Sequence, residues 1–442
     1  MTFPQILSLV LLVLILVLSI WRHVNIGLLG FCAAAVMVTA TQFYAVTGSA
    51  TTPGSALLLT SKSVFEHFPG SIVTLLIGVS LLFGHFERSG SLSWLTDKVY
   101  KAIGEHTLLI PWVGYMIGLF ISTAGAFSTA TITLLVPVIA ALGRRMPKIF
   151  FISEVAAIVG ANTGALSPIN PVGTVIRDSA NHAQVNFNGW LLWLLGTIVS
   201  VSTVLVLQII FSPSRMQDST NGKKPARGLA LLKPVAIDNN DKGQLNPAYA
   251  ICSTLSVLLF ITLVVFAGTD VGLTAISLAV LLLLLFPEYS KNLARNIPWN
   301  AVVVISGLLV FIGTMMSVHT MDALENRLLG MTTNQIILLF IITYLTTSLS
   351  NVESSTIGVI SLMTPMIFTI FGGSAHMSLI LAACVAPALL SVINPIHIAG
   401  TLVVSYTDEK QQDAMFRRLL TIAFFIVPII PGLTMILPAV ML

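Results

Sequence analysis

Two polar stretches of this chain repeat the same residue types in the same order. Residues 167–174 read SPINPVGT and residues 391–401 read SVINPIHIAGT, about half a chain length apart. Proline removes a backbone donor and disfavours helical geometry for the residue before it, so Asn170 and Asn394 are expected at the ends of interrupted helices. The Gly-Thr pair that follows allows a helix to restart. A restarted helix presents free N–H groups and a positive dipole end, which suit an anion.

A second pair of polar stretches precedes the first pair, one in each half of the chain. Residues 122–137 read STAGAFSTATITLLVP and residues 350–365 read SNVESSTIGVISLMTP, so each has a cluster of hydroxyl residues ahead of a proline. In lipid, an unsatisfied backbone group costs several kcal/mol, and non-helical backbone survives only where it is buried in protein or lines a watery cavity. The four breaks are therefore expected to converge on one site near the middle of the membrane.

This convergence predicts which side chains bind the ligand. Asn, Ser and Thr bind carboxylates without burying a fixed charge, and the carbonyl end of a half-helix suits sodium. Candidate substrate-binding residues are Ser128, Thr129, Ser167, Asn170, Thr174, Ser355, Thr356, Asn394, His397 and Thr401. Candidates for holding a coupling cation are Asn162, Asn351 and Glu353. No other metal site, no catalytic residue and no organic cofactor is expected; the coupling ion is Na+ or H+.

Structural roles compete with several of these assignments. A single Asn-Pro break in a membrane helix is often only a kink. His397 either donates to a carboxylate and titrates near physiological pH, or is a satisfied structural histidine. Glu353 either couples transport to a cation or reaches the outer water at the rim of its segment. Asn162 and Asn351 either offer ligands to a cation or cap helices.

Two further charged positions favour structural roles. Glu154 is expected to pair with the basic loop at residues 144–148. Arg177 and Asp178 are expected to form a local pair or a gate rather than to contact substrate.

The composition shows what kind of elements must position these residues. Of the 442 residues, 56% are hydrophobic and only 9% are charged, with a mean hydropathy of +0.95. No water-soluble domain of this length has that composition, so the chain is predicted to be an all-α polytopic membrane protein. Its three cysteines lie in apolar runs without CxxC spacing, which indicates neither disulfides nor a zinc site. The first apolar run is followed, not preceded, by positive charge, which indicates a first span rather than a signal peptide.

Apolar segments long enough to span a membrane occur in two sets with the same order. Each set has five spans and one double-length segment, which is interpreted as a hairpin that enters and leaves on one side. The predicted first repeat is 1–212, with a hairpin at 107–142 and a broken helix at 149–180; the hydrophilic linker is 213–246; the second repeat is 247–442, with a hairpin at 334–371 and a broken helix at 376–404. Five is odd, so the two halves are predicted to be inverted, with ten spans and two hairpins in all.

The basic residues predict the orientation, because cytoplasmic loops collect lysine and arginine. With both termini outside and the linker in the cytoplasm, only Lys62, Arg177 and Arg327 of the 21 basic residues lie outside. The predicted location is a cell membrane, with a bacterial inner membrane as the expected case. The net charge of +4 then reflects orientation and does not indicate nucleic-acid binding.

The paired hairpin tips and paired broken helices resemble the ion transporter superfamily that includes the divalent anion:sodium symporters. Residues 24–37 and 68–95 are similar to the amino-terminal half of MatC-type dicarboxylate (malonate) carriers. The resemblance implies a cation-coupled carrier of small dicarboxylates that works by an elevator-like movement, often as a homodimer. Symporters of the wider family carry Ser-Asn-Thr at both tips, whereas this chain has Phe127-Ser128-Thr129 and Ser355-Thr356-Ile357.

Other functions compete with a dicarboxylate carrier. A Na+/H+ or inorganic-anion exchanger of the same superfamily is the main alternative, although such exchangers are expected to carry more carboxylates in the core. Paired Asn-Pro turns are also typical of channels for water and glycerol, but those chains are shorter and lack double-length hairpins. No metalloprotease, P-loop or nucleophile-elbow motif occurs, so the chain is not expected to be an enzyme.

Overall fold

The computed structural model describes an all-helical chain. It covers residues 1–442 except 23, 47–58, 92–93, 95–97, 99–107, 144–146, 212–245, 291–292, 321–322, 324–326, 328–333, 354–355 and 408–410. No strand occurs in these described ranges. Eight of their helices are long and apolar enough to cross a membrane. The prediction of an all-α polytopic membrane protein is confirmed. The predicted linker, residues 213–246, lies outside the described residues except for Asn246.

Nine helices are described before the linker and twelve after it. The first group is α1 (Phe3–Arg22), α2 (Ile26–Val46), α3 (Ser61–Phe65), α4 (Gly70–Arg88), α6 (Ile110–Thr123), α7 (Ser128–Gly143), α8 (Pro147–Gly164), α9 (Pro171–His182) and α10 (Gly189–Ile210). The second group is α11 (Pro247–Phe266), α12 (Val271–Leu285), the 3-10 turns η2 (Pro287–Ser290) and η3 (Leu293–Asn296), α13 (Trp299–Ser317), α15 (Gln335–Val352), α16 (Thr356–Phe371), α17 (Met377–Leu390), η4 (Ser391–Ile393), α18 (Ile398–Tyr406), α19 (Gln412–Thr434) and α20 (Ile436–Met441).

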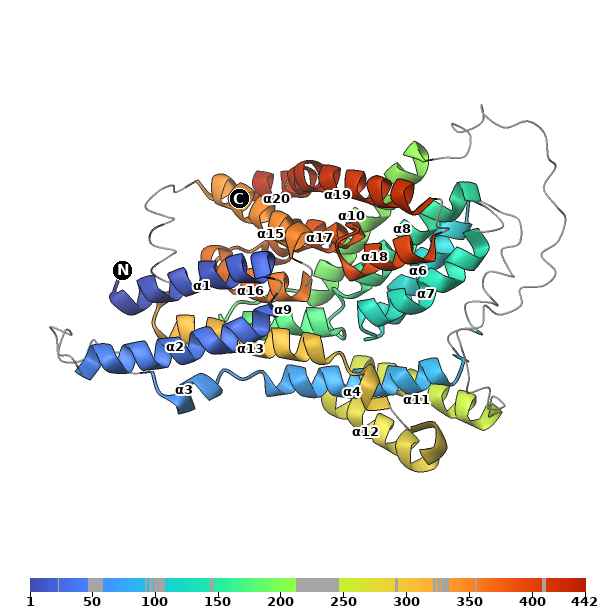
Figure 1. Ribbon diagram of the computed structural model, residues 1–442, viewed down its shortest axis with the longest axis horizontal. Coiled ribbons are helices and arrows are strands. Elements are labelled where there is room, and N and C mark those ends of the chain that lie inside the picture. Colours follow the sequence, from blue (N-terminus) through green and yellow to red (C-terminus); the bar gives the residue numbers. More distant parts are fainter. Residues whose placement is uncertain are drawn as a thin grey trace.

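Both double-length segments are divided near the middle into two helices. Residues 124–127 separate α6 from α7, which form the first hairpin, and residues 353–355 separate α15 from α16, which form the second. The first hairpin lies in the right-hand half of Figure 1, whereas the second lies in the left-hand half, where both termini are found. The hairpin tips therefore point toward the middle of the molecule from opposite ends. Inverted insertion of the two halves in a membrane, and which face is cytoplasmic, remain predictions.

Two long helices, α4 and α13, begin in the same unusual way. Pro69 and Pro298 precede them with nearly equal backbone angles (φ −80, ψ 65 and φ −76, ψ 69), and no side chain caps either helix. In both cases the N–H after the proline donates to the carbonyl two residues back, at 2.8 Å. The same local geometry, FPGS in one half and IPWN in the other, is a second structural repeat that is independent of the Asn-Pro stretches.

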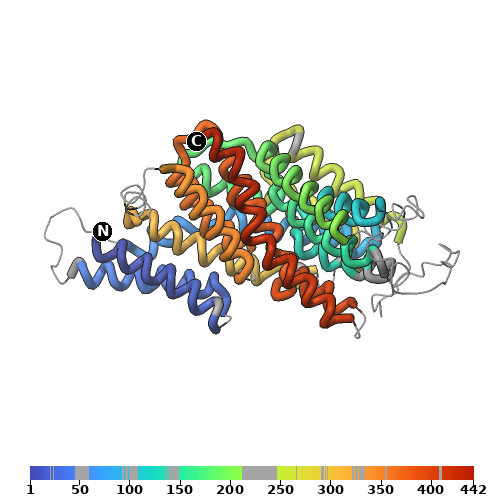
Figure 2. Tube along the Cα trace, turned by 90° about the horizontal axis from the view of Figure 1, so that it is seen from above, coloured from blue at the N-terminus to red at the C-terminus, as the bar shows by residue number. Residues whose placement is uncertain are grey.

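Close helix packing on α13 depends on small residues. Gly27 of α2 and Gly307 of α13 face each other so closely that a Cβ on either would overlap the backbone of the other helix. Such contacts are how membrane helices associate when lipid removes the hydrophobic driving force. Figure 2 shows α1 and α2, in dark blue, along one edge of the molecule. The pair α1–α2 thus packs against α13 at the periphery.

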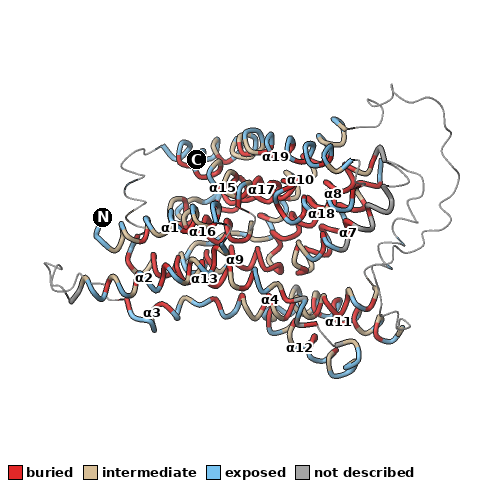
Figure 3. Tube along the Cα trace, viewed as in Figure 1, coloured by how far each residue is buried: buried red, intermediate tan, exposed pale blue. Residues whose placement is uncertain are grey.

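The helices that lead into the two repeated stretches, α8 over residues 149–164 and α17, are almost entirely buried. Figure 3 shows buried residues concentrated in α8, α9 and α17, while much of α12 and α19 is exposed. The halves also interlock: α9, the restarted helix of the first half, packs against α16 of the second hairpin, and α18 packs against α7 of the first hairpin. Each restarted helix therefore lies beside the hairpin of the opposite half.

Candidate functional site

Asn170 holds the tip of the first hairpin. Its Nδ2 donates to the carbonyls of Ser122 (2.8 Å), in the last turn of α6, and Ala126 (2.9 Å), within the turn between α6 and α7. Its Oδ1 accepts from Val172 N–H at 3.1 Å and so caps α9. Ser167 Oγ donates to the neighbouring carbonyl of Thr123 at 2.8 Å. Because Asn170 is fully buried and all three bonds stay within the protein, its amide joins the broken helix to the hairpin.

Asn394 makes the corresponding contact in the second half. Its Nδ2 lies 2.9 Å from both the carbonyl and the side-chain Oδ1 of Asn351, at the end of α15. His397 Nε2 lies 2.7 Å from the carbonyl of Ser350, one residue earlier. The carbonyl end of each hairpin's first helix is thus already bonded by the Asn-Pro stretch of its own half. We call these hydrogen bonds from each Asn-Pro stretch to its hairpin the clasp; whether Asn170 and Asn394 also bind substrate stays a prediction.

The Gly-Thr pairs complete the two breaks in matching ways. A Cβ on Gly173 would overlap the carbonyl of Ser167, and one on Gly400 would overlap the carbonyl of Asn394. Thr174 and Thr401 donate back to the carbonyls of Pro168 (3.4 Å) and Pro395 (2.8 Å). Only glycine lets the restarted helix fold back this closely, which explains its place in both stretches.

The two restarted helices differ at their amino ends. The side chain of Asn170 caps α9, but His397 occupies the N-cap of α18 without a side-chain cap bond. Ile398, the first residue of α18, is 53% exposed. The asymmetry arises because three extra residues, Ile396–Ile398, separate the Asn-Pro pair from the Gly-Thr pair in the second stretch. Among the described residues, α18 is therefore the restarted helix whose positive end is open.

That open end borders a cavity of about 270 Å³. The first hairpin contributes its tip, including Phe127, Thr129 and Thr131. The opposite wall comes from α4 and the start of α13, with Ser80, Glu87 and Asn300 as its polar residues. Ile398 closes the cavity from the second half. A site of this size, with a helix amino end, hydroxyls and one carboxylate, has room for a small carboxylate anion together with a cation or proton.

The structure brings only part of the predicted substrate set to this cavity. Thr129 lines it, while Ser128 is buried beside it at the start of α7. Ser167, Asn170, Asn394 and His397 are buried and bond to the hairpins, and none of them lines the cavity. Thr356 starts α16 at the tip of the other hairpin. Ser355 lies outside the described residues.

The predicted cation residues are spread over three places. Asn162 Nδ2 donates to the carbonyl of Ile158 within α8 at 3.0 Å. Asn351 is held by Asn394, as described above. Glu353 ends α15, and its Oε2 accepts a hydrogen bond from Ser19 of α1 at 2.7 Å. The structure does not gather these three residues into one cation site, and whether any of them binds a cation stays a prediction.

Sequence reasoning missed Glu87 and Asn300. In the sequence, Glu87 directly follows one apolar run and Asn300 lies near the start of another, so neither stands out as a polar residue inside the membrane. The sequence feature that could have indicated Asn300 is Pro-x-Asn at 298–300, where α13 begins without a side-chain cap. Only the tertiary packing brings both residues opposite the first hairpin tip.

Glu154 has a different environment from the one expected. It is fully buried on α8, and neither carboxylate oxygen has a hydrogen-bond partner among the described residues. Residues 144–146 of its expected basic partner loop lie outside the described residues. An ionised, unpaired carboxylate is very costly to bury in such a place, and the expected pairing with the basic loop, whose side chains lie outside the described residues, stays a prediction.

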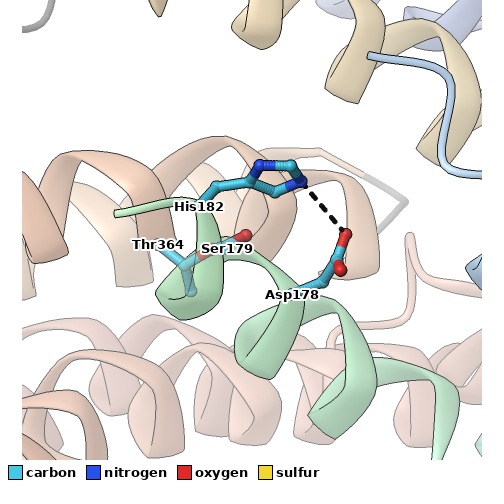
Figure 4. A network of polar contacts seen from close by, with 4 residues as sticks. All are labelled: Asp178, Ser179, His182 and Thr364. Atoms are coloured by element: carbon cyan, nitrogen blue, oxygen red, sulfur yellow. Dashed lines mark hydrogen bonds and ion pairs between the residues drawn. The ribbon is translucent and has the colours of Figure 1, made fainter. Parts of the chain in front are cut away.

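A second cavity, of about 300 Å³, lies at the other end of α4 and α13. It is lined by Glu66, His67, Asp178 and His182 among others. Figure 4 shows His182 and Asp178 on successive turns of α9, with their side chains 3.8 Å apart. The local pair expected for Arg177 and Asp178 is therefore replaced by a pair between Asp178 and His182, which sequence spacing of i and i+4 would have allowed.

Comparison with known proteins decides the family. A family model described as a citrate transporter, CitMHS, matches residues 14–389. The chain belongs to the CitMHS citrate transporter family. This result confirms the resemblance to the ion transporter superfamily, of which the CitMHS family is a part, whereas the likeness of the first half to MatC-type carriers stays a prediction. No curated protein sequence matches the chain.

A solved structure shows that the CitMHS chain shares its fold with another transporter. The crystal structure of the Alcanivorax borkumensis YdaH transporter, reported as having an unusual topology, superposes with a TM-score of 0.57 at 12% identity. The match covers 98% of this chain and 97% of that chain. The likeness shows that the shared fold extends over nearly the whole chain.

Proposed function

We propose that this protein is a secondary active transporter of small carboxylate anions, of the dicarboxylate or citrate class, driven by Na+ or H+. The observation that carries the proposal is the open amino end of α18 beside the hydroxyl residues of the first hairpin tip, in a cavity of carboxylate size. The name of the family supports citrate, and the resemblance to MatC-type carriers supports dicarboxylates.

In this proposal the residues have distinct tasks. The N–H groups that start α18 bind one carboxylate of the substrate, and Thr129 binds a second. Asn170 and Asn394 fix the hairpin tips so that these donors keep their positions. Glu87 lies on the wall formed by α4 and faces the bound anion. Its carboxylate would repel an anion that binds alone, so it favours binding of the anion together with a cation or a proton. Binding energy thus comes from dipoles and hydroxyls rather than from a buried arginine or lysine.

We further propose alternating access by an elevator-like movement. The interlocked set of both hairpins and both broken helices would move against α4 and α13, which carry one cavity near each of their ends. The supporting feature is the matched pair of cavities along this boundary. A homodimer in a bacterial inner membrane, with both termini outside and the linker in the cytoplasm, completes the proposed arrangement.

The alternatives predict other transport behaviour. An inorganic-anion or Na+/H+ exchanger would move ions without carboxylate, and a channel would conduct without accumulation. The test is uptake of labelled citrate, succinate, malate and malonate into proteoliposomes, with a sodium or a proton gradient applied separately. Accumulation of one of them above the external concentration under one gradient is expected. Equilibration without accumulation would favour a channel, and no carboxylate uptake under either gradient refutes the proposal.

A further inference from the structure

The peripheral helix α1 contacts the rest of the protein through polar bonds near both of its ends. Near its start, Ser8 Oγ lies 2.7 Å from Thr320 Oγ1, and Gln5 Nε2 donates to the carbonyls of Val318 and His319. Near its end, Ser19 Oγ donates to Glu353 Oε2 at 2.7 Å. The first group of contacts joins α1 to the segment after α13, whereas the second joins it to the tip of the second hairpin.

The contact between Ser19 and Glu353 is buried in an otherwise apolar region. The two residues are 6% and 7% exposed. Nearby residues of α1, α2 and α13 form one hydrophobic cluster that includes Leu362 of the second hairpin. A hydrogen bond in such surroundings is electrostatically strong, and breaking it leaves a polar group without compensation. The bond therefore resists separation of α1 from the hairpin tip.

Glu353 also lies at the turn of the second hairpin, where the regular helix of α15 ends. It ends α15 with extended backbone (φ −82, ψ 128), and its own N–H makes the last helical bond, to Leu349, at 2.8 Å. The first hairpin has no carboxylate at its tip, where the residues are Gly125, Ala126 and Phe127. A constraint by α1 thus applies to one of the two hairpins only.

We propose that Ser19 and Glu353 form a latch that holds the tip of the second hairpin against α1 and must open during each transport cycle. Ser19 is a positioning residue that acts through the Glu353 carboxyl. The inference goes beyond the proposed function, and it needs from that function only that the second hairpin moves. It gives Glu353 a role other than cation coupling, because one of its oxygens is already bonded to α1.

Amide hydrogen exchange in proteoliposomes tests the latch without any substrate. Ser19→Ala is expected to speed exchange at residues 350–353 at least tenfold and to leave the first hairpin tip, 122–127, unchanged. Ser8→Ala, which removes the other buried hydroxyl contact of the same helix, is the matched control and is expected to leave both tips unchanged. Ser19→Thr keeps the donor and is expected to restore slow exchange. Equal exchange in Ser19→Ala and wild type overturns the proposal, as does equal acceleration by Ser8→Ala.

A cysteine pair then tests whether opening is needed for transport. Ser19→Cys with Glu353→Cys, cross-linked by a short bifunctional thiol reagent, is expected to cross-link readily and to lose at least nine-tenths of its uptake until the link is reduced. The matched pair, Ser8→Cys with Thr320→Cys, is expected to cross-link and keep its uptake. Failure of the first pair to cross-link, or full uptake while linked, overturns the latch. Absence of uptake in the wild type would instead refute the proposed function and leave the exchange experiment valid.

The two roles of Glu353 are separated by Glu353→Gln. A glutamine keeps an oxygen that accepts from Ser19, so the latch predicts slow exchange at 350–353 and gradient-driven accumulation within about twofold of wild type. Glu353→Leu removes the acceptor, and the latch predicts that it matches Ser19→Ala, with an altered maximal rate and an unchanged KM. Loss of accumulation in Glu353→Gln with slow exchange retained would assign Glu353 to cation coupling and overturn the latch as its main role.

Discussion

Replacing Asn170 tests whether the Asn-Pro stretch clasps the hairpin. Asn170→Ala removes two bonds to the hairpin carbonyls and the cap of α9. Each hydrogen bond contributes about 1 kcal/mol and the cap about 1 kcal/mol. Ser122 O keeps the Gly125 N–H as a donor, so Ala126 O is the carbonyl that loses its donor, at a further cost of about 1 kcal/mol. The expected loss of unfolding free energy is roughly 3 to 5 kcal/mol.

Two companion variants separate the clasp from the cap. Asn246 caps α11 through a bond to Ala248 N–H and makes no clasp, so Asn246→Ala is expected to cost only about 1 kcal/mol. Asn170→Ser keeps an N-cap oxygen but loses the amide donors, and is expected to retain most of the loss. Stability is measured in detergent, in a background with Cys32 and Cys252 replaced by serine, with a thiol-reactive fluorophore that reports exposure of the buried Cys384. A loss for Asn170→Ala within 1 kcal/mol of that for Asn246→Ala would refute the clasp.

Three further predictions follow from the same geometry. Gly173→Ala and Gly400→Ala are each expected to abolish uptake, because the added Cβ would overlap the carbonyl of Ser167 or of Asn394. Gly373 has open space around it, so Gly373→Ala is expected to keep uptake. Uptake by Gly173→Ala would contradict the close approach of the two backbone segments. Glu154→Leu leaves the unfolding free energy unchanged or raises it, because it removes an unpaired buried carboxyl; a loss above about 2 kcal/mol would show that Glu154 has a partner. Thr129→Val raises KM for the carboxylate about five- to thirtyfold with unchanged stability, as loss of one hydrogen bond to the anion requires, whereas an unchanged KM in uptake assays would exclude Thr129 from the site.

The fold was largely predictable because its signals are local. Apolar length predicts the spans, and Asn-Pro followed by Gly-Thr predicts the breaks, since each depends on a few adjacent residues. The breaks lie where expected, with Asn170 as the N-cap of α9 and Asn394 at the end of η4. One small difference between the two Asn-Pro stretches was harder to interpret. Three extra residues after Asn394 leave the amino end of α18 uncapped, and the sequence did not indicate that this end would border the cavity.

The site was less predictable because it depends on contacts between distant segments. The sequence predicts that Asn170 and Asn394 bind the ligand; the structure shows their amides bonded to the hairpins, and whether they also bind substrate stays a prediction. Glu87 and Asn300 face the cavity only because α4 and α13 pack opposite the first hairpin tip. Glu353 was recognised as an unusual charge, yet its partner, Ser19, lies near the other end of the chain. Periodicity and motif spacing carry no information about such pairings.

The central claim is that a carboxylate binds between the first hairpin tip and the open end of α18. Its most direct test is substrate protection of Thr129→Cys, in a variant whose three native cysteines are replaced by serine or alanine. Citrate, or the dicarboxylate that the uptake assay identifies, is expected to slow modification of Cys at this position by a small charged thiol reagent, with half-protection near the KM. Cysteine at Gly373, away from the cavity, is expected to react at the same rate with and without substrate. Unchanged modification at position 129 by a saturating, transported carboxylate would contradict the proposed site.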